Sequence, residues 1–160
     1  MLFRLSNLLA FFALVIAVLV LFSNVAAITV STSDSYYFLA YDIIQGFVPE
    51  TQGISDLIAT EWWAIKILFA VVLLSLGTVI FQGKRLHLQR RFWEGSLAVQ
   101  VALLALIVVM LYQSADLLGG KVKYDLGIIL LVLMLAVSIL GWRVTLRDLF
   151  IREKKRKSGA

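Results

Sequence analysis

The sequence contains no cysteine, one proline and one histidine, and it has few charged residues for a chain of 160. Without cysteine there are no disulfides, iron–sulfur clusters, thiolate zinc sites or thiol nucleophiles. The single histidine, His87, excludes a haem held by two histidines of this chain. Hydrophobic residues make up 61% of the chain and charged residues 16%, whereas soluble domains are about half apolar and about a quarter charged. This composition predicts a membrane protein.

Residues for catalysis are also scarce. The sequence has no cluster of His, Asp or Glu within its apolar segments and no glycine-rich phosphate loop. The middle of these segments carries no carboxylate for proton relay, and they show no inverted repeat, which argues against an ion-coupled transporter. We therefore expect no metal, no cofactor and no enzymatic activity. An enzyme with a site in its loops ranks third among the functions considered below.

Four apolar segments are long enough to cross a bilayer, which takes about 20 helical residues. They cover about residues 5–28, 58–81, 92–112 and 124–144. Lipid offers no partners to backbone groups, so each span is expected to be a helix. The first segment resembles a signal peptide, but its apolar core is at the upper length limit for one, which favours a retained helix. The predicted fold is an all-α integral membrane protein, with four transmembrane helices in an up-down bundle forming one domain over 1–160.

The basic residues predict the orientation of these helices. Twelve of the fifteen fall at the chain ends or in the loop between the second and third spans. Because cytoplasmic loops are enriched in Lys and Arg, both termini and this loop are expected in the cytoplasm. The twelve are Arg4, Lys84, Arg85, Arg90, Arg91, Arg143, Arg147, Arg152, Lys154, Lys155, Arg156 and Lys157.

The first outer loop, residues 29–57, is long enough to hold structure of its own. Within "SDSYYFLAYDIIQGFVPE", Tyr37, Tyr41 and Ile44 have helical spacing, and Pro49 can end the segment. We expect a short interfacial helix, lying on the membrane or across the mouth of the bundle. The alternatives are a docking surface or a lid over a ligand. The candidate outer docking surface comprises Tyr37, Tyr41, Ile44, Phe47, Trp62 and Trp63.

A few polar residues lie inside the predicted spans. Lys66 is about a helical turn below Trp62 and Trp63, so its side chain either reaches the interface or pins the outer loop to the second span. Other polar residues share a depth in three spans, and such groups hydrogen-bond between helices. They either join the helices or line a pocket for a quinone or lipid headgroup. These residues are Ser75, Thr78, Ser96, Gln100 and Ser138.

The predicted cytoplasmic surface combines the loop "FQGKRLHLQRRFW" with a basic tail at residues 146–160. Cations near a membrane surface attract anionic headgroups, and the same groups can hold a protein partner. His87 is expected to be a solvated loop residue. The basic tail has neither a folded partner nor an aromatic platform beside it, which argues against nucleic acid. The candidate partner or lipid contacts are Lys84, Arg85, Gln89, Arg90, Arg91, Arg147 and Arg152.

Four short motifs, "MLFRL", "GKRLHLQRR", "YDLG" and "WRVTLRDLFIR", occur in this order along the chain. Through these motifs and their order, the chain resembles a family of short bacterial four-helix inner-membrane proteins that is known only as a domain of unknown function. The resemblance implies a bacterial inner-membrane location and supplies no catalytic residues. The matching positions are Arg4, Arg85, Leu88, Gln89, Arg91, Tyr124, Gly127, Arg143 and Asp148.

Taken together, these features favour a non-catalytic accessory or scaffold subunit of a larger membrane complex, of respiratory, photosynthetic, secretion or translocation type. Its expected partners are other integral membrane subunits and membrane lipids, and a bound lipid is compatible with the pattern. The alternative is a small membrane protein that binds or transports a lipid or quinone. Co-purification of stoichiometric partners would favour the first function, and non-protein density between the helices would favour the second.

Overall fold

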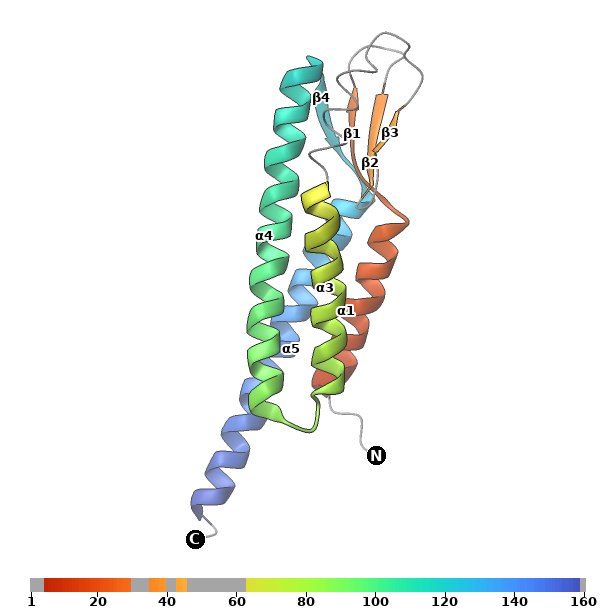
Figure 1. Ribbon diagram of the computed structural model, residues 1–160. Coiled ribbons are helices and arrows are strands. Elements are labelled where there is room, and N and C mark those ends of the chain that lie inside the picture. The colour runs from red at the N-terminus through yellow and green to blue at the C-terminus, as the bar shows by residue number, and fades with distance from the viewer. Residues whose placement is uncertain (1–4, 30–34, 40–42, 46–62, 159–160) are drawn as a thin grey trace.

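The computed structural model of the protein describes residues 5–29, 35–39, 43–45 and 63–158, and most of them are helical (Figure 1). Four helices run side by side in alternating directions. α1 packs against α3 and α5, and α4 packs against the same two neighbours. The predicted bundle of four apolar helices is confirmed. The helices are α1 (Leu5–Leu21), α3 (Trp63–Phe81), α4 (Leu86–Leu118) and α5 (Leu126–Ser158).

Three of these helices, α3, α4 and α5, are long and apolar enough to cross a membrane, whereas α1 is shorter at 17 residues. Each helix turns large apolar side chains outward, for example Phe11, Leu74, Val101 and Ile129. Continuous apolar surface of this kind is rare on soluble monomers and suits a lipid environment. The structure is therefore that expected of a helical membrane protein.

Small side chains allow close packing between α1 and α5. On α1, Ala10, Ala13 and Ala17 are completely buried and recur every three or four residues. On α5, Ser138 and Gly141 lie on the buried face at the same kind of spacing. Because small residues let two helix backbones approach each other, α1 and α5 form the most extensive helix contact in the bundle.

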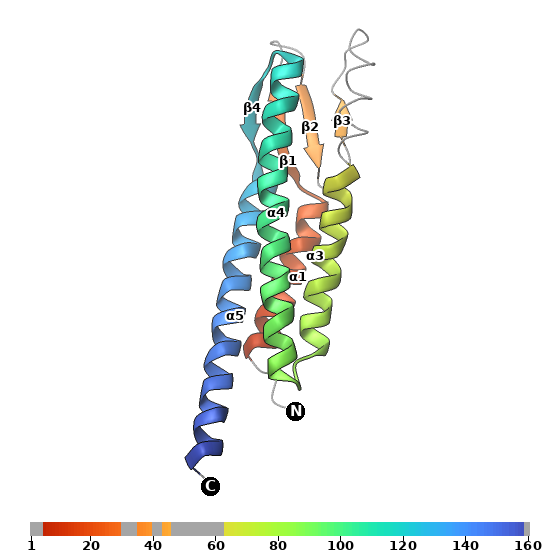
Figure 2. The same cartoon turned by 60° about the vertical axis from the view of Figure 1, so that its left-hand side comes forward.

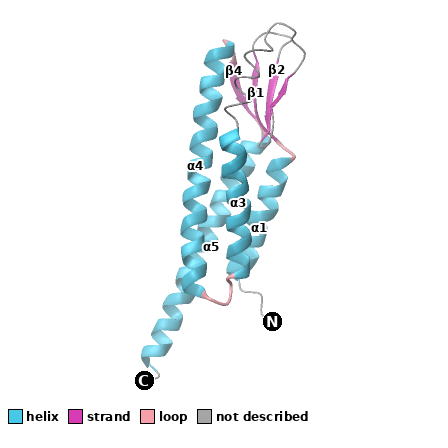
Figure 3. Cartoon of the chain, in the orientation of Figure 1, coloured by secondary structure: helices cyan, strands magenta, loops and turns pink. Residues whose placement is uncertain are grey.

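A four-stranded antiparallel sheet covers the end of the bundle opposite the N- and C-terminal ends (Figures 2 and 3). The strand order is β3-β2-β1-β4, so β1 is central. Ala27 of β1 lies opposite Tyr37 on one side and Lys123 on the other. The strands are β1 (Asn24–Thr29), β2 (Ser35–Leu39), β3 (Ile43–Gln45) and β4 (Lys121–Tyr124).

This sheet corrects the prediction of an all-α fold with an interfacial helix in the first outer loop. Wherever the structure describes that segment, at 35–39 and 43–45, it is strand. The aromatic and β-branched residues that fit one helix face also favour strands, and the described strands of this segment pair with β1 and with each other. The remaining parts of the predicted helix, including Tyr41 and Phe47, lie outside the described residues.

Two glycines let the sheet approach the helices. Gly119, with φ of 64°, ends α4 in the left-handed conformation, which glycine adopts at helix ends without strain. At Gly127, in the first turn of α5, a Cβ atom would lie 2.6 Å from the backbone oxygen of Asn24. The Asp125 amide also donates a hydrogen bond to the Val25 carbonyl, at 3.1 Å. The start of α5 is thus joined to β1 by backbone contact.

Several predicted boundaries shift. α1 ends at Leu21 rather than near 28, because residues 24–29 join the sheet. α4 starts at Leu86, so the connection expected at 82–91 shortens to 82–85. α5 continues as helix to Ser158, through the predicted basic tail. The start of the second span, 58–62, lies outside the described residues.

Candidate functional site

A hydrogen-bonded polar layer joins α3, α4 and α5 in the middle of the bundle. The Gln100 Nε2 group donates to the hydroxyls of Ser96 and Ser138, each at 3.0 Å. The Ser75 hydroxyl donates to Ser96 Oγ, also at 3.0 Å, which extends the network to α3. The structure thus brings together four of the polar residues that the sequence placed at one depth. The fifth, Thr78, donates only to the Ser75 carbonyl of its own helix, at 2.7 Å.

A second polar cluster lies nearer the N-terminal end of the bundle and joins α1, α4 and α5. The Ser6 hydroxyl lies 2.6 Å from Thr145 Oγ1 and accepts a hydrogen bond from Trp93 Nε1 at 3.2 Å. Thr145 donates to the Gly141 carbonyl at 2.9 Å. Ser6, Trp93 and Thr145 are completely buried. The sequence analysis did not identify this cluster, although the buried residues of α4 and α5 recur at intervals of three and four, which could have indicated it.

Gln89 was predicted to contact a partner or lipid at the surface, and this prediction is wrong. Its side chain is completely buried, and its Nε2 group donates to Asn7 Oδ1 at 2.6 Å and to the Val79 carbonyl at 3.3 Å. The reason is the early start of α4 at Leu86, which places Gln89 on the inward face one turn before Trp93. Gln89 therefore ties α4 to α1 and α3.

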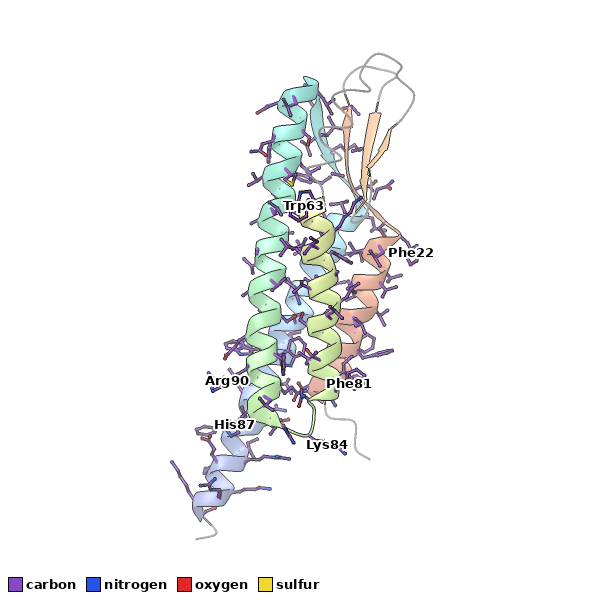
Figure 4. All side chains as sticks on the ribbon, in the orientation of Figure 1. Phe22, Trp63, Phe81, Lys84, His87 and Arg90 are labelled. Atoms are coloured by element: carbon purple, nitrogen blue, oxygen red, sulfur yellow. The ribbon has the colours of Figure 1, made fainter. Side chains whose placement is uncertain are left out.

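Cations gather at the end of the bundle that carries both chain ends (Figure 4). The described residues there include eleven lysines and arginines but only three carboxylates, Glu94, Asp148 and Glu153. Among all described residues the only ion pair is Arg90–Glu94, at 2.8 Å. Of the predicted surface contacts, Lys84, Arg85, Arg91, Arg147 and Arg152 are exposed and make no ion pair with any described residue. This end therefore carries a large uncompensated positive charge.

A cavity of about 400 Å³ opens within this basic end, between the α3–α4 connection and α5. Lys84, Arg85 and Arg152 contribute cationic groups to its lining, and Leu86, Leu88 and Leu149 contribute apolar surface. His87 and Glu153 complete the lining. Figure 4 shows Lys84 in the connection before α4, His87 at the start of α4 and Arg90 further along the helix. A cationic cavity with an apolar wall is suited to binding an amphipathic anion.

The predicted outer candidates are only partly described. Tyr37 and Ile44 lie opposite each other in the pairing of β2 with β3. Trp63 opens α3 and is exposed. Lys66 is also exposed and forms no ion pair with a described residue. Tyr41, Phe47 and Trp62 lie outside the described residues.

Within the described part of the chain, no three His, Asp or Glu side chains come close enough together to hold a metal ion. The buried polar residues of the two clusters are neutral and form hydrogen bonds between helices, while the buried Oε1 atoms of Gln89 and Gln100 have no hydrogen-bond partner among the described residues. At the basic end, cations that form no ion pair with a described residue line a cavity. No known protein family and no curated protein matches this chain.

Proposed function

We propose that this protein is a non-catalytic accessory subunit, which spans the membrane with all four helices and packs beside a larger membrane assembly. Its cytoplasmic side is the basic end, and both termini lie there, because Lys and Arg are enriched on that side of membrane proteins. The likeness to the short bacterial four-helix family supports an inner-membrane location. The polar layer and the second polar cluster support a structural role, because they hold the bundle together.

The observation that carries the proposal is the projecting end of α5. Residues 150–158 continue the helix beyond the rest of the bundle, and every side chain among them is exposed (Figures 1 and 2). Phe150 is 69% exposed and Ile151 is 45% exposed, at the start of a segment with five cations and one carboxylate. A helical end of this length gains little stability alone. A partner subunit with an acidic cytoplasmic face would cover the two apolar side chains and neutralise the cations.

Removing the apolar side chains of this segment tests whether a partner subunit binds to it. In a mild-detergent membrane extract, the native chain is expected to run in native mass spectrometry with integral membrane subunits in a fixed ratio. The double variant Phe150→Ala, Ile151→Ala should lose those subunits by about tenfold or more, because exposed apolar anchors contribute about 1 kcal/mol or more each to an interface. The matched control Phe11→Ala, Phe12→Ala removes exposed rings from α1 and should retain them. A native chain that runs only as a monomer or homo-oligomer would contradict the proposal.

The absence of cysteine makes the proposed orientation easy to test, because a single introduced thiol is unique. Lys121→Cys lies in β4 and Lys155→Cys near the end of α5, and both positions are exposed. In intact spheroplasts, a membrane-impermeant maleimide should label Lys121→Cys at once and Lys155→Cys only after lysis. Equal labelling before lysis would show that the two ends are not separated by a membrane.

A further inference from the structure

The cavity at the basic end differs from a merely charged surface, because two distant segments build it. Lys84 and Arg85 come from the connection between α3 and α4, and Arg152 comes from α5. All three side chains line one cavity of about 400 Å³. The fold thus places these cations around a common concave space, which extended tail cations such as Lys155 and Lys157 do not share.

The charges of this cavity are available to a ligand. None of the three cations forms an ion pair with a described residue, and the only carboxylate in the lining is Glu153. Like charges that converge without compensation repel one another. A bound anion would remove that repulsion and accept hydrogen bonds from two guanidinium groups and one ammonium group, and Arg matches phosphate geometry especially well.

The apolar part of the cavity indicates what else the anion carries. Leu86, Leu88 and Leu149 form part of the lining. Toward the middle of the bundle, α3 ends in Phe81, which is 86% exposed, and at the level of the cavity α5 carries Phe150, which is 69% exposed. The cavity therefore lies where the apolar surface of the helices ends and the cations begin. In a membrane, this is the level of the phospholipid headgroups.

We propose that this cavity is a binding site for one anionic phospholipid of the cytoplasmic leaflet. The lipid phosphate lies among Lys84, Arg85 and Arg152, the glycerol region lies against the three leucines, and the acyl chains follow the apolar helix surface. The proposal rests on the helices crossing a bilayer and not on a partner subunit. It adds a defined lipid ligand to the role proposed above.

The test titrates dioleoyl-phosphatidylglycerol into the purified, delipidated full-length chain and counts bound lipids by native mass spectrometry. The native chain should retain one tightly bound lipid and should prefer it to dioleoyl-phosphatidylcholine. The triple variant Lys84→Gln, Arg85→Gln, Arg152→Gln should bind it more weakly by about fivefold for each cation removed. The matched control Lys155→Gln, Arg156→Gln, Lys157→Gln removes the same charge outside the cavity and should stay within about twofold of the native affinity.

A single variant separates a loss of lipid binding from a loss of folding. Arg152 is exposed, so its substitution leaves the packed bundle untouched. Arg152→Glu should reduce phosphatidylglycerol binding while its melting temperature in detergent stays at the native value. Equal losses in the two triple variants would show diffuse charge attraction and overturn the site. Equal affinity for phosphatidylcholine, or displacement of the lipid by inorganic phosphate at matched concentration, would overturn the anionic phospholipid as its ligand.

Discussion

Replacing Gly141 with alanine is expected to destabilise the four-helix bundle by about 1–3 kcal/mol, the usual cost of overpacking a filled core. A Cβ atom at this position would clash with the Trp93 indole, with Cη2 at 2.7 Å and Cζ2 closer still. The indole cannot move aside freely, because it is completely buried and donates a hydrogen bond to Ser6. The added methyl group therefore strains the place where α1, α4 and α5 meet. Thermal unfolding in mild detergent measures the loss.

The control for this prediction is Gly77→Ala, near the C-terminal end of α3. A Cβ atom there would meet nothing within 4 Å, so the substitution should be neutral or stabilising by up to about 1 kcal/mol through helix propensity. A second comparison uses Trp93→Phe, which removes the ring atoms that cause the clash. Gly141→Ala should then cost less in the Trp93→Phe background than in the native one. Equal costs in the two backgrounds would show that the indole is not what excludes a side chain.

Replacing Gly127 with alanine is expected to separate β1 from the start of α5. The new Cβ atom would lie 2.6 Å from the Asn24 oxygen and 2.9 Å from Val25 Cα, and backbone atoms cannot rotate away as a side chain can. The Asp125 amide would then lose its bond to the Val25 carbonyl, which adds about 1 kcal/mol to the overpacking cost of about 1–3 kcal/mol. Hydrogen–deuterium exchange of β4 (Lys121–Tyr124) should accelerate, because β4 pairs only with β1 among the described strands.

Gly95→Ala is the matched control for the junction variant. Gly95 lies within α4, and a Cβ atom there also meets nothing within 4 Å. Exchange in β4 should match the native protein, and the melting temperature should be equal or higher. If Gly127→Ala leaves both exchange in β4 and the melting temperature at native values, β1 does not press on α5 at this point.

The sequence predicted the helices better than the sheet, for a physical reason. A membrane-spanning helix satisfies its own backbone, so composition along one segment reveals it. A strand depends on neighbours elsewhere in the chain, and the partners of Ala27 are Tyr37 and Lys123. Tyr37, Tyr41 and Ile44 do have helical spacing, but this spacing alone does not distinguish a helix from a strand. The pairing of β2 with β1 and β3, which spacing within one segment does not reveal, decided the outcome.

The candidate sites also divide into those that the sequence reveals and those that depend on the packing of the helices. The polar layer was predictable, because Ser96, Gln100 and Ser138 stand out within apolar spans. Gln89 was misplaced because it lies among surface cations in the sequence, and only the start of α4 at Leu86 reveals that it faces inward. The cavity at the basic end joins Lys84 and Arg152, which are far apart in the chain. Its shape could not be predicted before the packing of α5 was known.

The pairing of β1 with β4 has a consequence for the order in which the protein is made. α1 and β1 are synthesised first, yet α5, the most extensive partner of α1, and β4, which pairs with one edge of β1, come near the end of the chain. During synthesis, the small-residue face with Ala10, Ala13 and Ala17 has no lasting partner until α5 enters the membrane. A ribosome that stops before Lys121 leaves this face and one edge of β1 uncovered. An incomplete chain thus exposes a helix face and a strand edge of the kind that quality-control proteases recognise. In the finished chain, α5 and β4 cover both.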